Sequence, residues 1–108
     1  GADLTGTAAV GNDGIVLASR MASGANPDRV GAVSATMLGV TRRVSGELAI
    51  GGAEETIIKG EHGYFLVVPA GDQALLTVGL RQSANLGMVR IELRDAAEAI
   101  KQALDSRN

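Results

Sequence analysis

The side chains that could carry out chemistry in this sequence are few. His62 is the only histidine, and the sequence contains no cysteine. No second histidine and no cysteine is available to complete a metal site, and a nucleophilic serine needs a positioned base, so we expect neither a metal site nor a Ser-His-acid triad. His62 lies between Gly60 and Gly63, a composition typical of a tight turn, and we interpret it as an exposed turn residue. Turn, cap or helix-surface positions account for the candidate carboxylates Asp13, Asp72, Asp95 and Asp105.

The 15 glycines make a phosphate-binding loop the next possibility to test. Such a loop needs two glycines five positions apart, followed by Lys and then Ser or Thr at the start of a helix. The segment Gly24 to Arg29 precedes an expected helix, but it has neither the lysine nor the second glycine. No Gly-x-Gly-x-x-Gly pattern occurs either. We therefore predict no catalytic residue, no metal site, no cofactor and no enzymatic activity.

Composition limits the remaining classes of function. At 108 residues the chain has room for one hydrophobic core, so we expect a single domain over residues 1–108. A net charge of −2 argues against general nucleic-acid binding, and 45% hydrophobic residues exclude intrinsic disorder. No apolar run approaches the ~20 residues of a membrane span, and the start of the sequence lacks a signal-peptide pattern. We therefore expect a cytoplasmic protein with no membrane partner.

Apolar runs that alternate with turn residues predict five strands and two helices. The expected strands cover residues 5–10, 15–19, 55–59, 64–68 and 74–80, and the expected helices cover residues 28–48 and 86–107. Asp13-Gly14 between two apolar runs is a strong hairpin signal. The continuous apolar run from Phe65 to Val68 is typical of a strand that is covered on both faces. These elements predict an α/β (α+β layered) domain in the order β-β-α-β-β-β-α, with a five-stranded antiparallel sheet and helices on both faces.

Both helices carry terminal signals. Asn26 can cap the first helix, with Pro27 at its first position, and Asn85 can cap the second. The segment Ala49-Ile50-Gly51-Gly52 is expected to end the first helix, with glycine at the left-handed position. The second helix has one apolar stripe, which we expect to face the sheet: Leu86, Val89, Leu93, Ala97, Ile100 and Leu104.

The first helix is too apolar for a helix that covers one face of a monomer. Its large apolar residues recur every three or four positions and are expected to pack on the sheet: Val30, Val33, Met37, Val40, Val44 and Leu48. A second face is small or weakly polar: Gly31, Ala35, Leu38, Gly39, Thr41 and Ser45. That face either lies in solvent or packs against a partner chain, and we favour the partner. Strand 55–59 follows, and as an edge strand it could pair with another chain. Both features suggest a symmetric homodimer.

Several segments together resemble the roadblock (dynein light chain, roadblock type) family, in particular its bacterial and archaeal members that partner Ras-like GTPases. The segments are Thr7–Ser19 (TAAVGNDGIVLAS), Glu47-Leu48 at the end of the small-residue helix, Glu54–Gly60 (EETIIKG), Leu66–Asp72 (LVVPAGD) and Ser83–Gly87 (SANLG). The resemblance implies the roadblock, profilin-like fold. Family members usually begin with a helix before the first strand, and the pattern predicts no such helix in residues 1–108.

The resemblance also implies a dimer that joins the middle helices and third strands of two chains into one ten-stranded sheet. Such dimers are non-catalytic platforms that bind and regulate Ras-like small GTPases, as activators, exchange-type regulators or scaffolds. The expected dimer interface comprises Ala35, Leu38, Gly39, Thr41, Ser45, Thr56 and Ile58. The expected partner-binding residues are Arg42, Arg43 and Glu47, although the two arginines could instead be solvated charges near the helix C-terminus. The alternatives are a small-molecule-sensing signalling domain and a structural subunit of a motor or transport complex.

Overall fold

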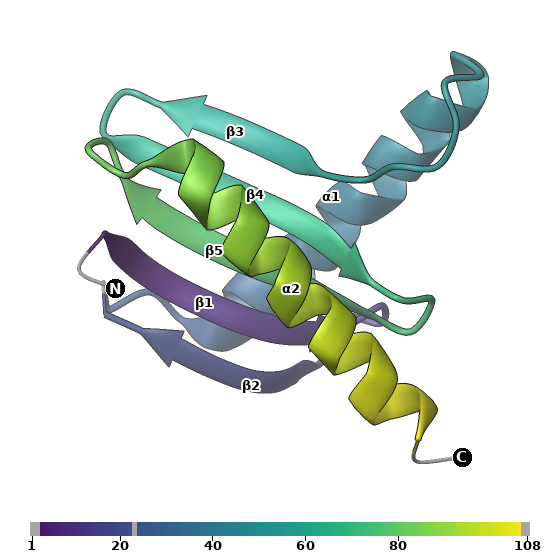
Figure 1. The fold of residues 1–108 in the computed structure, drawn as a ribbon, viewed down its shortest axis with the longest axis horizontal. Coiled ribbons are helices and arrows are strands. Elements are labelled where there is room, and N and C mark those ends of the chain that lie inside the picture. Colours follow the sequence, from purple (N-terminus) through teal and green to yellow (C-terminus); the bar gives the residue numbers. More distant parts are fainter. Residues whose placement is uncertain (1–2, 23, 107–108) are drawn as a thin grey trace.

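The computed structural model describes residues 3–22 and 24–106 as a sheet between two helices (Figure 1). Its elements are β1 (Leu4–Gly11), β2 (Val16–Met21), α1 (Pro27–Glu47), β3 (Thr56–Gly60), β4 (Gly63–Ala70), β5 (Ala74–Arg81) and α2 (Leu86–Asp105). The element order and the expected fold class are confirmed. Most predicted boundaries are within two residues of the observed ones. β4 continues past its predicted end at Val68, through Pro69 to Ala70.

The five strands form one antiparallel sheet in the order β2-β1-β5-β4-β3. β5 is central, while β2 and β3 are the two edges. The pairing of β3 with β4 runs only from Thr56↔Val67 to Gly60↔Gly63, so Pro69 lies beyond the last residue that β3 pairs. Proline lacks an N–H donor, and a position without a partner on that side accommodates it. The strand order confirms that β3, the third strand, lies at an edge of the sheet.

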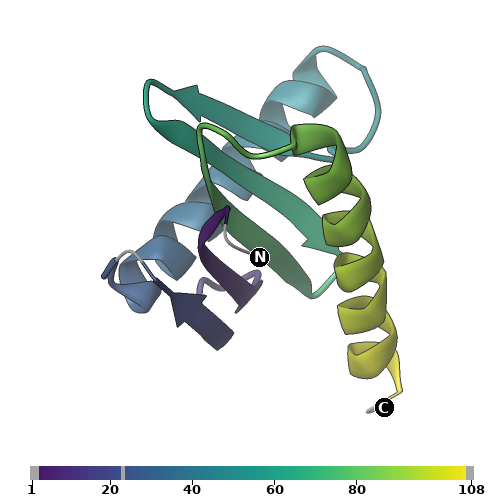
Figure 2. The same cartoon turned by 60° about the vertical axis from the view of Figure 1, so that its left-hand side comes forward.

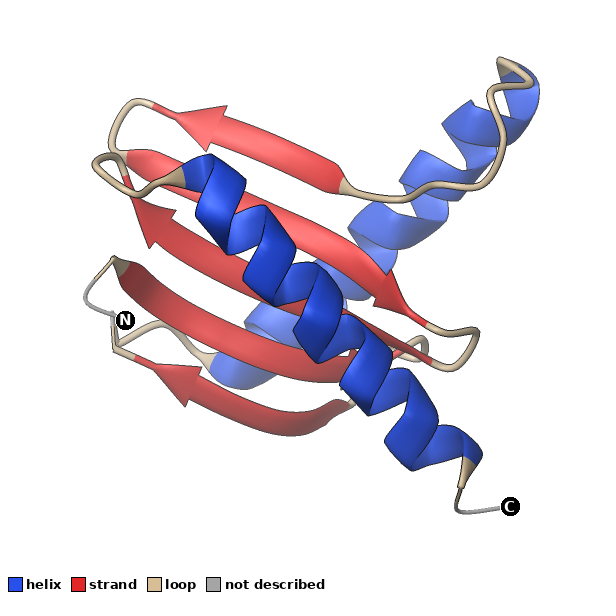
Figure 3. Ribbon diagram, viewed as in Figure 1, coloured by secondary structure: helices blue, strands red, loops and turns tan. Residues whose placement is uncertain are grey.

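The helices lie on opposite faces of the sheet, as Figures 2 and 3 show. α2 covers β4 and β5, and its predicted stripe is confirmed: Leu93 and Ala97 are buried, and the other four residues pack around them. α1 covers β1 and β2 and then crosses β4. The core on this face contains Ala8, Val10, Leu38, Val67 and Leu75. Both cores are mainly aliphatic, and the two aromatic residues of the sequence, Tyr64 and Phe65, pack against them from opposite faces.

Local side-chain hydrogen bonds begin both helices as predicted. Asn26 Oδ1 accepts from the backbone N–H groups of Asp28 and Arg29, at 2.9 and 3.2 Å. Asn85 Oδ1 accepts from the N–H of Met88 at 3.1 Å. The turn between β1 and β2 contains Gly14 at φ +88°, a conformation that glycine adopts at little cost.

The end of α1 differs from the sequence prediction. Ala49, and not a glycine, holds the left-handed position directly after the C-cap residue Leu48, with φ 54°. Its N–H donates to the carbonyl of Gly46, and the N–H of Ile50 donates to the carbonyl of Ser45. These two bonds form a Schellman motif, which satisfies carbonyls at the helix end. The hydrogen-bond pattern places the left-handed residue here, two positions before Gly51.

The orientation of α1 is reversed from the prediction. The buried residues of α1 are the small ones and Leu38: Gly31, Ser34, Leu38 and Ser45. The large residues predicted to pack on the sheet are mostly exposed: Val33, Val40, Val44 and Leu48. The reason is the short distance between helix and sheet. A Cβ on Gly31 would lie 2.7 Å from Val16 Cγ2 and 2.9 Å from the carbonyl oxygen of Gly14, so only a small face fits there.

Candidate interaction surface

The exposed face of α1 carries a strip of large aliphatic side chains. Val40 is 58% exposed, and the strip continues on both sides of it along the helix: Val33, Val44 and Leu48. Along the chain these residues follow one another at intervals of four or seven positions, a spacing that places them on one side of an α-helix. Single exposed aliphatic residues are common on protein surfaces, but a contiguous strip of them indicates an interaction site.

The strip borders a groove of about 500 Å³ between α1 and the edge strand β3. The groove is lined by Ala32, Val33, Thr36, Met37, Val40, Thr41, Thr56 and Ile58, none of which is charged. A hydrogen bond of 3.1 Å from Thr56 Oγ1 to Thr41 Oγ1 holds the start of β3 against the helix. An apolar groove without charge resembles the centre of a protein interface, where charged residues are depleted.

β3 adds a backbone component to the same surface. β3 pairs only with β4, so one side of its backbone is unpaired within the sheet. Unpaired strand N–H and C=O groups can extend a sheet into a second chain. In Figure 1 the C-terminal turns of α1 project past this edge of the sheet, so the exposed strip and the free edge lie on the same side of the molecule.

The structure separates the predicted interface residues into three groups. Leu38 and Ser45 are buried within the chain, with Leu38 in the core beneath α1, so the expectation that they face a partner is corrected. Ala35 is half-buried and packs against the same core. The other four predicted residues border the groove or the exposed side of the helix: Gly39, Thr41, Thr56 and Ile58.

Sequence reasoning missed the residues that dominate the surface: Val33, Met37, Val40 and Val44. Their periodicity identified a helix face, but the same periodicity is expected of a face that packs on a sheet. The size difference between the two faces was a usable signal, because glycine and serine at helical spacing allow a helix to approach a sheet closely.

The predicted partner-binding residues lie near the C-terminal end of α1. Arg43 Nε is 3.4 Å from Glu47 Oε1, and both side chains are largely exposed. Arg43 is three positions from Val40 and therefore borders the apolar strip, whereas Arg42 is two positions away and points to a different side of the helix. An exposed pair of this kind contributes little stability, about 0.3–0.5 kcal/mol. Both side chains of the pair are therefore accessible to a partner.

The described residues 3–22 and 24–106 contain no cluster of three or more His, Asp and Glu side chains that could hold a metal ion. His62 lies in the β3–β4 turn, and its side chain is 94% exposed, so the turn interpretation is confirmed. In the same part of the chain, no helix has the length and hydropathy of a membrane-crossing segment.

Comparison with known proteins assigns the family. The profile described as the Roadblock/LC7 domain matches residues 2–80, which is more than half of the chain. The chain belongs to the Roadblock/LC7 family. A relative from Methanocaldococcus jannaschii, the uncharacterized protein MJ0714, is 40% identical over 98 residues, which cover 91% of this chain and 82% of that protein. This membership confirms the resemblance inferred from the sequence motifs.

Solved structures of Roadblock/LC7 proteins have the same fold. A structure described as MglB with a tetrameric arrangement superposes with a TM-score of 0.82 at 26% identity, and it covers 92% of this chain and 76% of the MglB chain. A Roadblock/LC7 domain from Streptomyces avermitilis superposes with a TM-score of 0.88 at 16% identity, and it covers 94% of this chain and 86% of that domain. The second likeness concerns the fold alone.

Proposed function

We propose that this Roadblock/LC7 protein is a non-catalytic homodimer that binds and regulates a small Ras-like GTPase. The observation that carries the proposal is the uncharged aliphatic groove between α1 and the edge strand β3. The resemblance to roadblock proteins that partner Ras-like GTPases, together with the structural likeness to MglB, supports a regulatory role over an enzymatic one. Cytoplasmic location is part of the same proposal.

In the proposed dimer, two β3 edges pair around a twofold axis and the two α1 helices lie side by side. A twofold interface uses the same patch on both subunits, so one strip of aliphatic residues meets its own copy. Val33, Val40 and Ile58 would leave water together, while the backbone of β3 continues the sheet into the partner. The interface of this proposal keeps Thr41, Thr56 and Ile58 from the sequence prediction and replaces Leu38 and Ser45 with the exposed valines.

The GTPase would bind the outward side of the paired helices, where Arg43 and Glu47 border the strip. Arginine is enriched at interfaces because its planar head forms several directed hydrogen bonds while its stem packs on apolar surface. A platform without catalytic groups can still regulate hydrolysis, because it can hold switch segments of the GTPase in a productive geometry.

Light scattering tests the dimer directly. The chain has a mass of 11.0 kDa, so a dimer has twice that mass, 22.0 kDa. We expect this mass at micromolar concentration. A monomer at every accessible concentration would refute the proposed assembly.

Calorimetry with a cognate GTP-loaded Ras-like GTPase tests the partner. We expect Arg43→Glu to weaken binding while the mass stays that of a dimer. Arg42→Glu is the matched control, because it introduces the same charge one residue away on another side of the helix. Equal affinities of the wild type and both variants would remove these arginines from the binding site. A pull-down that recovers only structural proteins and no GTPase would favour the alternative role as a structural subunit.

A further inference from the structure

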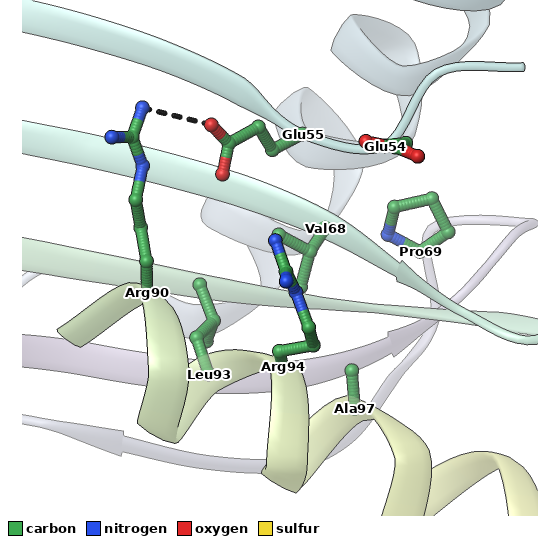
Figure 4. Close-up of a pocket in the computed structure, with 8 residues that line it drawn as sticks. All are labelled: Glu54, Glu55, Val68, Pro69, Arg90, Leu93, Arg94 and Ala97. Atoms are coloured by element: carbon green, nitrogen blue, oxygen red, sulfur yellow. Dashed lines mark ion pairs between the residues drawn. The ribbon is translucent and has the colours of Figure 1, made fainter. Parts of the chain in front are cut away.

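A second groove lies on the opposite face of the sheet, between α2 and the segment that leads into β3 (Figure 4). Its volume is about 440 Å³, within the range of about 300–1,000 Å³ that is usual for small-molecule sites. Val68, Leu93 and Ala97 supply an apolar floor, and Pro69 lies at the side. Four charged side chains line the rest of the groove: Glu54, Glu55, Arg90 and Arg94.

Two of these four charged side chains, Arg90 and Glu55, form an ion pair with each other. Arg90 Nη2 lies 2.8 Å from Glu55 Oε1, and this ion pair joins α2 to the residue before β3. The two side chains are 41% and 31% exposed, so the pair is partly shielded from water.

The other two charged residues are Arg94 and Glu54, and both are exposed. Arg94 and Glu54 form no ion pair with any residue in the described ranges 3–22 and 24–106. Figure 4 shows the Arg94 side chain extending from α2 across the groove, while Glu54 lies at the loop on the other side. The groove therefore presents one cation and one anion above an aliphatic floor. A ligand that complements it carries a carboxylate, an ammonium group and an aliphatic side chain.

We infer that this groove binds a free aliphatic α-amino acid. The α-carboxylate would lie against the Arg94 guanidinium, which can donate two parallel hydrogen bonds to it. The α-ammonium would lie against Glu54, and the side chain would cover Val68, Leu93 and Ala97. The Arg90–Glu55 ion pair bounds the groove, which favours a small molecule over a long peptide.

Calorimetric titration with L-leucine tests this inference. We expect saturable binding that weakens at least tenfold in Arg94→Ala and in Glu54→Gln. Lys101→Ala is the matched control, because it also removes a cation from α2 but does not line the groove. Both substituted groove residues are exposed, so the variants are expected to keep the wild-type circular dichroism spectrum.

Three derivatives of leucine identify the groups that are recognised. N-acetylleucine lacks the ammonium, leucinamide lacks the carboxylate, and N-acetylleucinamide imitates a residue inside a peptide. We expect each to bind at least tenfold more weakly than leucine. Equal binding of N-acetylleucinamide would overturn the inference in favour of a peptide segment. Absence of leucine binding, or binding that Arg94→Ala leaves unchanged, would also overturn it. The measurement does not depend on a GTPase, so its failure is distinct from failure of the proposed function.

Discussion

Val40→Asp separates folding from assembly in this protein. Val40 is 58% exposed in the single chain, and it lies at the middle of the aliphatic strip on α1. Valine and aspartate have similar helix propensities, and surface substitutions usually change stability by about 0.5 kcal/mol or less. We therefore expect the isolated chain to keep its fold. This expectation is the opposite of the one that follows from the sequence alone, which places Val40 in the core.

The proposed dimer should respond strongly to the same change. Full burial of a valine contributes about 1.5–3 kcal/mol relative to full exposure, so burial of the remaining 58% would contribute about 1–2 kcal/mol per chain. Two copies give about 2–4 kcal/mol per dimer, and each 1.4 kcal/mol is tenfold in affinity. The dissociation constant should thus rise roughly 30- to 700-fold from lost burial alone. Desolvation of two carboxylates at the interface adds to this loss.

Sedimentation or light scattering over a concentration series measures the dissociation constant, and circular dichroism measures the fold. Leu38→Asp is the contrasting variant, because Leu38 is two positions away and only 3% exposed. An unpaired carboxylate there lies in the core, so we expect this variant to unfold. A Val40→Asp protein that stays dimeric, or that unfolds as Leu38→Asp does, would falsify the assignment of the two helix faces.

Four further variants test the local structure. Gly31→Ala should destabilise the chain by about 1–3 kcal/mol in urea unfolding, because the new Cβ would lie 2.7 Å from Val16 Cγ2. A Cβ at Gly46 would have no atom within 4 Å, so Gly46→Ala should stabilise α1 by about 0.5–1 kcal/mol. The opposite order of stabilities would contradict the close packing of α1. Ala49→Gly should raise stability by roughly 0.5–1 kcal/mol, because glycine adopts φ 54° without the cost of about 1–2 kcal/mol that alanine incurs. An unchanged unfolding midpoint would count against strain at this position. His62→Ala should leave the melting temperature, mass and GTPase affinity unchanged, and any lost activity would reveal a role for this exposed turn residue.

Local signals in the sequence determined most of the secondary structure. Asn26 and Asn85 were identifiable as helix caps because a short polar side chain before an apolar helical pattern satisfies free N–H groups. Asp13-Gly14 marked the first hairpin, since glycine tolerates the positive φ that the turn requires. The stripe of α2 was also correctly assigned to the core, because its other faces are charged and only one side of the helix could be buried.

The tertiary structure alone decided which face of α1 meets the sheet. Both candidate faces are poor in charge, so hydrophobic periodicity could not distinguish them. The decision depends on distance: Gly31 and Ser34 allow α1 to lie close to the β1–β2 hairpin, and larger side chains would collide with Val16. The valines are consequently left on the exposed side. The groove on the α2 face also arises from tertiary structure, because Glu54 and Arg94 are 40 positions apart and only the fold brings them to one site.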